Sequence, residues 1–367
     1  MGRSVVTDIT KRRREVTVAD VAREAGVGKA TAARALGNYG AVSESVRDRV
    51  LAAAERLDYR PNELARSMNT GKSKTIGVIV GDIENGYFGL AMRGITDAVA
   101  GAGYDVVLIN TSEDVDTEVD AVRVLLDKRV DGMIVSPASS FHTQHLHDVH
   151  ATGRPLVLLD RRIDGLPVPS VGVEIAVAAE QATAALLEAG HRRVAFVTAL
   201  ADPGDWTPGE PLRVSSVTER LSGISAALSS AGIAPDRELI HFGATGFVEA
   251  AAVLDDLLAL SEPPTAILAS DSLIALDLLR AARARGLRIP DDLSFVMFDD
   301  FPWAELIDPP LSVVSQPIYE VGVAAGRTIL RLLGGRTEPD AEMLAATFIA
   351  RESIGRVGGG APEGCVD

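Results

Sequence analysis

Residues 17–36, TVADVAREAGVGKATAARAL, decide the fold of the N-terminal part of the chain. Thr17 is a favourable N-cap residue for a helix. Apolar side chains then recur at the spacing of one helical face, at Val18, Val21, Ala22 and Ala25. Gly26 stands where this helix has to stop, because glycine enters the left-handed region without a steric penalty. A second helix is predicted from Lys29 to Leu36.

These two helices are predicted to cross closely and form a helix-turn-helix. Alanines on the inner side of the second helix allow a close approach, and its outer side carries Lys29, Thr31 and Arg34. The second helix of such a pair can enter the major groove of DNA. The same pattern is also typical of a two-helix corner in any α-helical domain, so this segment alone leaves that alternative open.

The residues that follow extend a helical head over residues 16–61. Ser43 is the expected cap of a third helix, whose apolar face comprises Val46, Val50, Ala53, Ala54 and Leu57. Pro61 ends the preceding element, and Asn62 can cap one or two further turns of helix from Glu63 to Met68. Residues 62–74 therefore read as a hinge helix and a flexible basic linker.

This order of segments resembles the LacI/GalR family of bacterial repressors. The matching positions are Asp20-Val21-Ala22, Ala25-Gly26-Val27, Thr31, Arg34, Val42-Ser43, Arg47, Val50, Tyr59 to Asn62, Ala65-Arg66-Ser67 and Thr75 to Ile83, and the likeness extends to about residue 354. The departures are Gly28 for the family's usual Ser, Ala32-Ala33 for Val-Ser, and Met68 for Leu. The resemblance implies a DNA-reading head, a hinge helix that enters the minor groove, and a ligand-responsive body that dimerises.

We expect the head to bind a near-palindromic operator in double-stranded DNA as a homodimer, because one recognition helix covers too few base pairs. Lys29 and Ala30 lie in the first turn of the second helix, which meets base edges, and Arg34 is placed for a phosphate or a guanine. By resemblance, Met68 wedges between central base pairs. The candidate DNA-binding residues are Thr17, Lys29, Ala30, Thr31, Arg34, Asn62, Ala65, Arg66 and Met68.

The charge distribution supports a separate DNA-binding head. Residues 1–74 contain 15 Lys and Arg against 9 Asp and Glu, a net charge of +6, whereas the whole chain carries −15. The acidic body would repel DNA and confine contact to the head. The basic run at residues 11–14 lies in an arm, residues 1–15, that we expect to be disordered, although it could add phosphate contacts.

Composition excludes several other classes of protein. No uncharged apolar run is long enough to span a membrane, and the N-terminus lacks the apolar segment of a signal peptide. The single cysteine, Cys365, lies in an expected flexible tail over residues 356–367 and permits no intramolecular disulfide. We therefore expect a cytoplasmic, nucleoid-associated protein without a cofactor.

From Thr75 onward, buried strands alternate with amphipathic helices. Strands are predicted near 76–80, 106–109, 133–135, 156–159, 194–197, 266–268 and 295–298, with helices between them. The fold class is thus an all-α helix-turn-helix head followed by an α/β, bilobed, periplasmic-binding-protein-like body with two doubly wound parallel sheets. The body spans residues 75–355, with one subdomain at about 75–160 plus 300–331 and the other at about 161–299 plus 332–355.

Polar residues stand at the predicted carboxyl ends of these strands, where doubly wound folds bind ligands. Planar donors and acceptors there suit adjacent hydroxyl groups. The resemblance assigns the effector-binding positions to Asn85, Phe88, Arg162, Arg220, Asp271 and Gln316. Singly, each has a structural alternative, since Asp271 can cap its helix, Arg162 can pair with a surface carboxylate, and Phe88 can belong to the core.

No catalytic or metal-binding pattern stands out, so we expect no enzyme. Four histidines at positions 142, 145, 147 and 150 do not converge at helical spacing, and we interpret them as a solvated helix face. The leading hypothesis is a repressor of carbohydrate-use genes that responds to a sugar-like effector. A purine or nucleoside effector, a sugar-binding module without a transcriptional role, and an enzyme of sugar or nucleotide metabolism are the alternatives.

Overall fold

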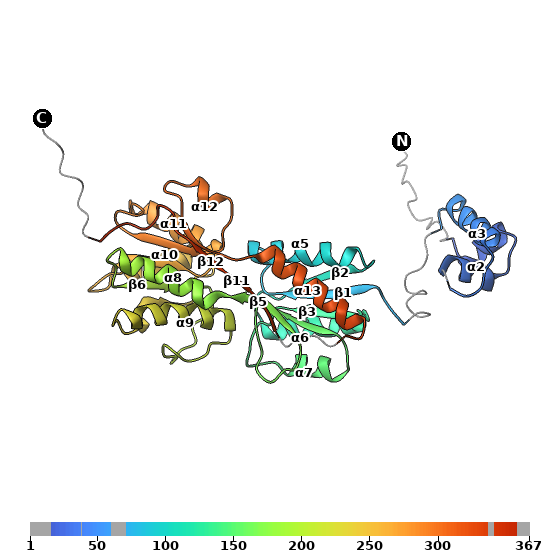
Figure 1. The fold of residues 1–367 in the computed structure, drawn as a ribbon, viewed down its shortest axis with the longest axis horizontal. Coiled ribbons are helices and arrows are strands. Elements are labelled where there is room, and N and C mark those ends of the chain that lie inside the picture. The colour runs from blue at the N-terminus through green and yellow to red at the C-terminus, as the bar shows by residue number, and fades with distance from the viewer. Residues whose placement is uncertain (1–15, 38, 60–70, 337–340, 358–367) are drawn as a thin grey trace, which may run out of the picture. The chain divides into compact units, whose positions relative to one another are not determined.

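A computed structural model describes residues 16–37, 39–59, 71–336 and 341–357 of the 367-residue chain. The chain divides into two compact units, a head (residues 1–73) and a body (residues 74–367) (Figure 1). The expected basic arm, most of the hinge segment and most of the tail lie outside the described residues. Within the described residues, no helix is long and apolar enough to cross a membrane.

Within residues 16–37 and 39–59, the head forms a bundle of three helices, α1 (Val18–Glu24), α2 (Lys29–Gly37) and α3 (Glu44–Arg56). Thr17 and Asp20 form the predicted N-terminal cap, because the Asp20 amide donates to Thr17 Oγ1 and the Thr17 amide donates to the Asp20 carboxylate. Gly26 has φ of +65°, as the turn requires. The inner side of the bundle consists of Val21, Ala22, Ala25, Ala32, Ala35, Val50, Ala53 and Ala54. Ser43 precedes α3 without a side-chain capping hydrogen bond, so its predicted capping contact is absent.

The body contains two six-stranded sheets. The first sheet has the order β11-β5-β4-β3-β1-β2, and all its strands are parallel. Its strands are β1 (Thr75–Val80), β2 (Asp105–Asn110), β3 (Gly132–Val135), β4 (Leu156–Leu159), β5 (Ser170–Glu174) and β11 (Ala341–Ala345). Its helices are α5 (Gly86–Ala100), α6 (Val115–Asp127), α7 (Gln144–Ala151) and α13 (Ile318–Leu333).

The second sheet has the order β12-β10-β9-β8-β6-β7, and only β12 among its described strands runs antiparallel to its neighbour. Its strands are β6 (Val194–Val197), β7 (Ile240–His241), β8 (Ala266–Ala269), β9 (Ser294–Phe298), β10 (Ser312–Ser315) and β12 (Thr347–Ile349). Its helices are α8 (Ile175–Glu188), α9 (Ser215–Ser230), α10 (Phe247–Leu258), α11 (Ser272–Ala284) and α12 (Trp303–Leu306). The prediction of two parallel α/β lobes is confirmed.

The chain passes between the lobes three times, after β5, after β10 and between β11 and β12. These crossings differ from the subdomain limits predicted near 160, 300 and 331. Strand 170–174 pairs with β4 in the first sheet, strand 312–315 pairs with β9 in the second, and strand 341–345 returns to the first. The short strands β5, β10 and β11 were not among those predicted, because their place depends on distant pairing partners.

Glycine allows α5 and α13 to pack closely in the first lobe. A Cβ on Gly94 of α5 would lie 2.2 Å from the Tyr319 carbonyl oxygen, and one on Gly322 of α13 would lie 2.0 Å from the Ala91 carbonyl oxygen. The two helices lie alongside each other in Figure 1. This packing fixes α5 against α13. The first turn of α5 borders the cavity described below.

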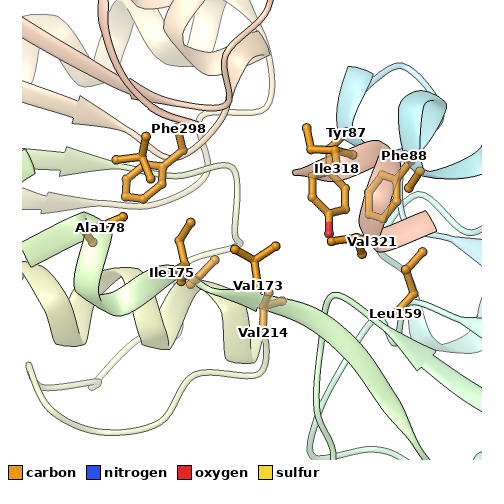
Figure 2. Close-up of a cluster of buried hydrophobic side chains, with 14 of the residues drawn as sticks. Tyr87, Phe88, Leu159, Val173, Ile175, Ala178, Val214, Phe298, Ile318 and Val321 are labelled. Carbon is orange, nitrogen blue, oxygen red and sulfur yellow. The ribbon is translucent and has the colours of Figure 1, made fainter. Parts of the chain in front are cut away.

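One cluster of buried side chains extends from the first lobe into the second. Figure 2 shows Tyr87, Phe88, Ile318 and Val321 on the first-lobe side and Phe298 and Ala178 on the second-lobe side. Val173 and Ile175, which flank the first crossing, lie between these two groups. The apolar core is therefore continuous where the chain crosses from the first lobe into the second.

Candidate functional site

The outer side of α2 presents the side chains that were predicted to read DNA. Lys29, Ala30 and Arg34 are exposed, and Thr31 is half-buried. The inner alanines Ala32 and Ala35 are buried at 0% and 3% exposure, so the helix has one packed and one open face. An exposed Lys and Arg on the open face of a second helix suit phosphate oxygens and guanine edges.

The remaining DNA-binding candidates are either engaged within the head or lie outside the described residues. Thr17 is exposed, but its hydroxyl donates a 2.7 Å hydrogen bond to Asp20 as part of the cap of α1. Its hydroxyl is therefore already used within the head. Asn62, Ala65, Arg66 and Met68 lie outside the described residues.

A cavity of about 900 Å³ opens between the two lobes of the body. The first lobe contributes residues that follow β1, β2 and β4, and the second lobe contributes residues that follow β6, β8 and β9. The cavity therefore lies at the carboxyl ends of the parallel strands, as predicted from the fold. Four of the six predicted effector-binding residues line it, namely Asn85, Phe88, Arg220 and Asp271.

Asn85 and Phe88 come from the loop after β1 and the first turn of α5. The Asn85 side chain caps α5 by accepting a 2.9 Å hydrogen bond from the Tyr87 amide, which orients it at the cavity wall. Phe88 is 4% exposed and packs edge to face against Tyr87 at a centroid distance of 5.4 Å. Burial, together with the Asp160 carboxylate, raises the pKa of Tyr87 well above its usual value. Phe88 thus belongs to the core and touches the cavity at the same time.

Arg220 and Asp271 lie on the second-lobe side. Arg220 is 8% exposed, and its guanidinium carbon lies 5.0 Å from the centre of the Phe298 ring. Asp271 caps α11, accepting hydrogen bonds from the amides of Leu273 at 2.9 Å and Ile274 at 3.0 Å. Burial raises the pKa of the Asp271 carboxyl, while these hydrogen bonds and Arg220 oppose that rise. Asp271 therefore caps α11 and lines the cavity at the same time.

Arg162 does not belong to the described cavity wall, contrary to the prediction. Its guanidinium is half-exposed and pairs with Glu219, and its amide donates to Ser215 Oγ at 3.0 Å. The preceding residue, Arg161, lines the cavity instead. Asp160 has φ of +66°, and this local turn separates the directions of the two adjacent arginines. Sequence alone marked the Asp-Arg-Arg run but could not tell which arginine turns inward.

Arg161 is held firmly in the first lobe. Its side chain is 8% exposed and makes two hydrogen bonds to the Glu113 carboxylate, at 2.6 and 2.7 Å, and one to the Pro137 carbonyl oxygen at 2.6 Å. The Asp160 carboxylate lies 3.7 Å from its Nε. Glu113 also lines the cavity and was not among the predicted residues, because it follows β2 in a loop that carries no motif.

Gln316 is likewise absent from the described cavity wall and acts behind it. It is 8% exposed, and its Nε2 donates a 2.5 Å hydrogen bond to Asp299 Oδ1. Asp299, at the end of β9, lines the cavity with φ of +73°. Burial raises the pKa of Asp299 to about 7, with Asp271 and Asp160 adding to the rise and Arg220 and Gln316 opposing it. Gln316 was predicted to bind the effector, whereas in the structure it holds the Asp299 carboxylate that lines the cavity.

Several hydrogen bonds join the two lobes beside the cavity. Arg213, in the loop before α9, donates to the carbonyl oxygens of Ala138 at 3.1 Å and Glu113 at 3.3 Å. The Ser140 amide donates to the Arg213 carbonyl oxygen at 2.7 Å, and Ser216 Oγ donates to Asp160 Oδ2 at 3.1 Å. Arg213 thus lines the cavity and ties the second lobe to two loops of the first.

The four histidines do not behave as one solvated face. His145 is mostly buried, and its Nε2 lies 2.5 Å from Oε1 of the buried Glu118, whose other oxygen accepts a 2.6 Å hydrogen bond from the Ala138 amide. His142 is exposed, and His147 and His150 are half-buried. Among the described residues, no group of His, Cys, Asp and Glu has the geometry of a metal site. The prediction missed the buried pair because Glu118 lies on another helix.

Two family models match the chain, one in the head and one in the body. Residues 17–62 match the family described as bacterial regulatory proteins, lacI family. Residues 183–354 match the periplasmic binding protein-like domain. The first match covers the head helices and the second covers most of the second lobe together with α13.

Individual relatives resemble the chain over nearly its whole length. Catabolite control protein A of Priestia megaterium is 31% identical over 322 residues, which cover 88% of this chain and 94% of the relative. The crystal structure of the lac repressor dimer bound to operator and the anti-inducer ONPF aligns with a TM-score of 0.76 and 26% identity, covering 93% of this chain and all of that one. The complex of the transcriptional regulator CelR with cellobiose aligns with a TM-score of 0.65 and 28% identity, over 92% and 100% of the two chains.

Proposed function

The chain belongs to the LacI family of bacterial transcriptional regulators, and from this premise we propose that it is a dimeric repressor whose operator binding is controlled by a sugar-like effector in the interlobe cavity. The proposal has three parts, the DNA contact, the effector site and the dimer. The cavity, lined from both lobes by hydroxyl-binding side chains, is the observation that carries the link between ligand and DNA.

The open face of α2 supports the DNA contact. Lys29, Ala30 and Arg34 are exposed there, and the net charge of +6 over residues 1–74 favours a polyanion. The lac repressor structure is a dimer on its operator, which supports a two-fold symmetric site for this chain as well. We propose that Lys29 and Ala30 meet base edges and that Arg34 contacts a phosphate or a guanine.

The composition of the cavity wall supports a hydroxyl-rich effector. Asn85, Arg220 and Asp271 offer planar donors and acceptors, and Asp160 and Asp299 add two further carboxylates. Tyr87 and Phe88 are the aromatic residues of the described wall, and both are at most 5% exposed because they pack on each other. They therefore present little ring surface for stacking a purine or pyrimidine base, which favours a sugar over a nucleoside. The CelR structure is titled as a complex with cellobiose, in agreement with this choice.

Exposed apolar side chains support a dimer formed along the body. Val248 is 73% exposed on α10 and Leu276 is 45% exposed on the adjacent α11. In the first lobe, Leu90 on α5 and Leu108 on β2 are 40% and 41% exposed. A second copy of the chain that packed along the body would remove such apolar side chains from water.

One experiment tests the DNA and effector parts together. Genomic fragments bound by the purified chain are selected and sequenced, and the recovered site is titrated in a gel shift at fixed salt. A near-palindromic site whose occupancy changes when one monosaccharide or disaccharide of a panel is added supports the proposal. Recovery of no specific site would reject the regulator role, and a response to nucleosides alone would replace the sugar by the rival effector. Turnover of a panel member would favour the enzyme hypothesis.

A further inference from the structure

Carboxylates outnumber cations on the wall of the interlobe cavity. The acidic residues are Asp82, Glu84, Glu113, Asp160, Asp271, Asp277 and Asp299, and the cations are Arg161, Arg213 and Arg220. Two of these arginines are already used by the protein. Arg161 holds the Glu113 carboxylate with two hydrogen bonds, and Arg213 donates to backbone carbonyl oxygens.

Arg220 is the remaining cation of the described wall. The residue is 8% exposed, and its Nε is buried without a hydrogen-bond partner among the described residues. Its guanidinium rests on the Phe298 ring, at 5.0 Å from the ring centre, which holds the group in place without using its hydrogen-bond donors. A buried guanidinium with an unused donor requires a ligand that supplies an acceptor.

Three carboxylates, those of Asp160, Asp271 and Asp299, line the same cavity as this guanidinium. The positive charge of Arg220 opposes the rise in the pKa of Asp271 and of Asp299, and the negative charge of Asp160 adds to the rise at Asp299. Each carboxylate also has protein partners, and Asp271 accepts on both of its oxygens, from the amides of Leu273 and Ile274 and from Ser270 Oγ. Asp299 Oδ1 accepts from Gln316, and Asp160 Oδ2 accepts from Ser216. Both residues line the cavity, so their carboxylates can accept a hydrogen bond from a ligand there.

We propose that this cavity accepts an uncharged, hydroxyl-rich ligand and excludes anionic ones, such as phosphorylated sugars, sugar acids and nucleotides, with Asp160 and Asp299 as the residues that enforce the exclusion. This inference rests on the proposed function, because it assumes that the effector binds between the lobes. It goes further by assigning the charge of the effector and the side chains that select it.

The balance of donors and acceptors explains the selection. A hydroxyl group can donate to a free carboxylate oxygen and accept from Arg220 at the same time. A phosphate or carboxylate can only accept, so it satisfies Arg220 but meets the negative charge of Asp160 and, above the pKa of about 7 of Asp299, that of Asp299 as well. Because this repulsion acts in a cavity partly shielded from water, it outweighs a single pairing with Arg220. We expect an anionic derivative to bind on the order of a hundredfold more weakly than its neutral parent.

The first test uses inorganic phosphate as the probe and the full chain as the protein. Thermal unfolding is followed with increasing phosphate at constant ionic strength and at about pH 8.5, above the pKa of about 7 of Asp299, so that its carboxylate is ionised. We expect no stabilisation of the wild type that depends on Arg220. The double variant Asp160→Asn/Asp299→Asn keeps the shape of the wall but removes two charges, and we expect phosphate to raise its Tm. Adding Arg220→Gln to the double variant should abolish that gain, which separates the cavity from phosphate bound at the basic head.

A matched control removes the same number of charges elsewhere. Asp116 and Glu262 are exposed and lie outside the cavity wall, so Asp116→Asn/Glu262→Gln should respond to phosphate as the wild type does. Arg220-dependent stabilisation of the wild type by phosphate would overturn the proposal. So would a double variant that is as indifferent to phosphate as the wild type, because the aspartates would then not be the cause of exclusion.

The second test compares neutral sugars with their phosphates by calorimetry, using ribose with ribose 5-phosphate and glucose with glucose 6-phosphate. In each pair, we expect the neutral sugar to bind more tightly than its phosphate. The double variant Asp160→Asn/Asp299→Asn should reduce this difference in affinity. Tighter binding of a phosphorylated member to the wild type would reject the inference. Operator binding is measured with the same preparations, so that a failure of the regulator role is seen separately from a failure of anion exclusion.

Discussion

Gln316 donates a 2.5 Å hydrogen bond from Nε2 to Oδ1 of Asp299, so the two residues act as one unit at the second-lobe side of the cavity. Asp299 is 1% exposed and lines the cavity, whereas Gln316 stands behind it. This arrangement fixes the direction of a buried carboxylate whose pKa is raised to about 7. A ligand bound there would meet a carboxylate that changes its protonation near neutral pH.

The first prediction concerns this carboxylate and pH. Because the pKa of Asp299 is about 7 in the folded chain and near 3.8 in the unfolded chain, the folded state holds more protons between these two values. Stability should therefore fall as pH rises from about 4 to about 7, by at most about 4 kcal/mol from this group. Asp299→Asn should flatten that slope in denaturant unfolding measured across the pH range. An unchanged slope in the variant would show that Asp299 is not the group responsible.

The second prediction contrasts the two adjacent arginines. Arg161→Ala should destabilise the body by about 2–3 kcal/mol, because it leaves the partly buried Glu113 and the Pro137 carbonyl oxygen without their partner. Arg162→Ala removes a half-exposed pair with Glu219 and should cost less than about 1 kcal/mol. Urea unfolding of both variants checks the order. Equal losses would contradict the inward and outward placement of the two side chains.

The third prediction concerns the close approach of α5 and α13. Gly94→Ala should lower the free energy of unfolding by about 1–3 kcal/mol, because the added methyl group would meet the Tyr319 carbonyl oxygen. Gly89 lies in the same helix with nothing within 4 Å of an added Cβ. Gly89→Ala should therefore raise stability by about 0.5–1 kcal/mol through helix propensity. Thermal unfolding of the pair checks the opposite signs, and a loss in both would point to a cause other than packing.

The fourth prediction concerns the DNA-reading face. Arg34→Ala should weaken operator binding by about 1–3 kcal/mol if Arg34 contacts a base. Arg56 on α3 pairs with Glu24 inside the head, and Arg56→Ala removes the same charge from a different helix. Gel-shift titrations at several salt concentrations compare the two variants. Equal losses with parallel salt dependence would mean that Arg34 contributes only its charge, and no loss would remove it from the interface.

The fifth prediction concerns the tie between the lobes. Arg213→Ala removes the hydrogen bonds to the carbonyl oxygens of Glu113 and Ala138, so the lobes should open more readily. We expect faster amide hydrogen exchange at residues 136–140 and a larger radius of gyration in small-angle scattering. Arg288→Ala, which removes local pairs with Asp291 and Asp292, is the matched control and should leave both unchanged. Identical exchange in the two variants would show that Arg213 does not hold the lobes.

The sequence by itself determined the parts of the fold that depend on local order. The Thr17 cap, the Gly26 turn and the alanine side of α2 predict the helix-turn-helix because capping, left-handed φ and helical spacing all act within a few residues. Buried strands alternating with amphipathic helices predicted the two α/β lobes for the same reason. The cavity's position followed from the rule that ligands meet the carboxyl ends of parallel strands.

Only the tertiary structure decided which side chains face that cavity. Arg161 lines the cavity, whereas Arg162 does not. Asp299 lines the cavity, and Gln316 donates a hydrogen bond to it from behind. His145 pairs with the buried Glu118, which lies on another helix. The strands β5, β10 and β11 also take their sheets from partners far along the chain. The physical reason is common to all of these. Sequence patterns indicate the local backbone conformation and which face of a helix or strand a residue occupies. The orientation of a side chain at a site is set instead by hydrogen bonds and ion pairs to groups that only the folded chain brings near.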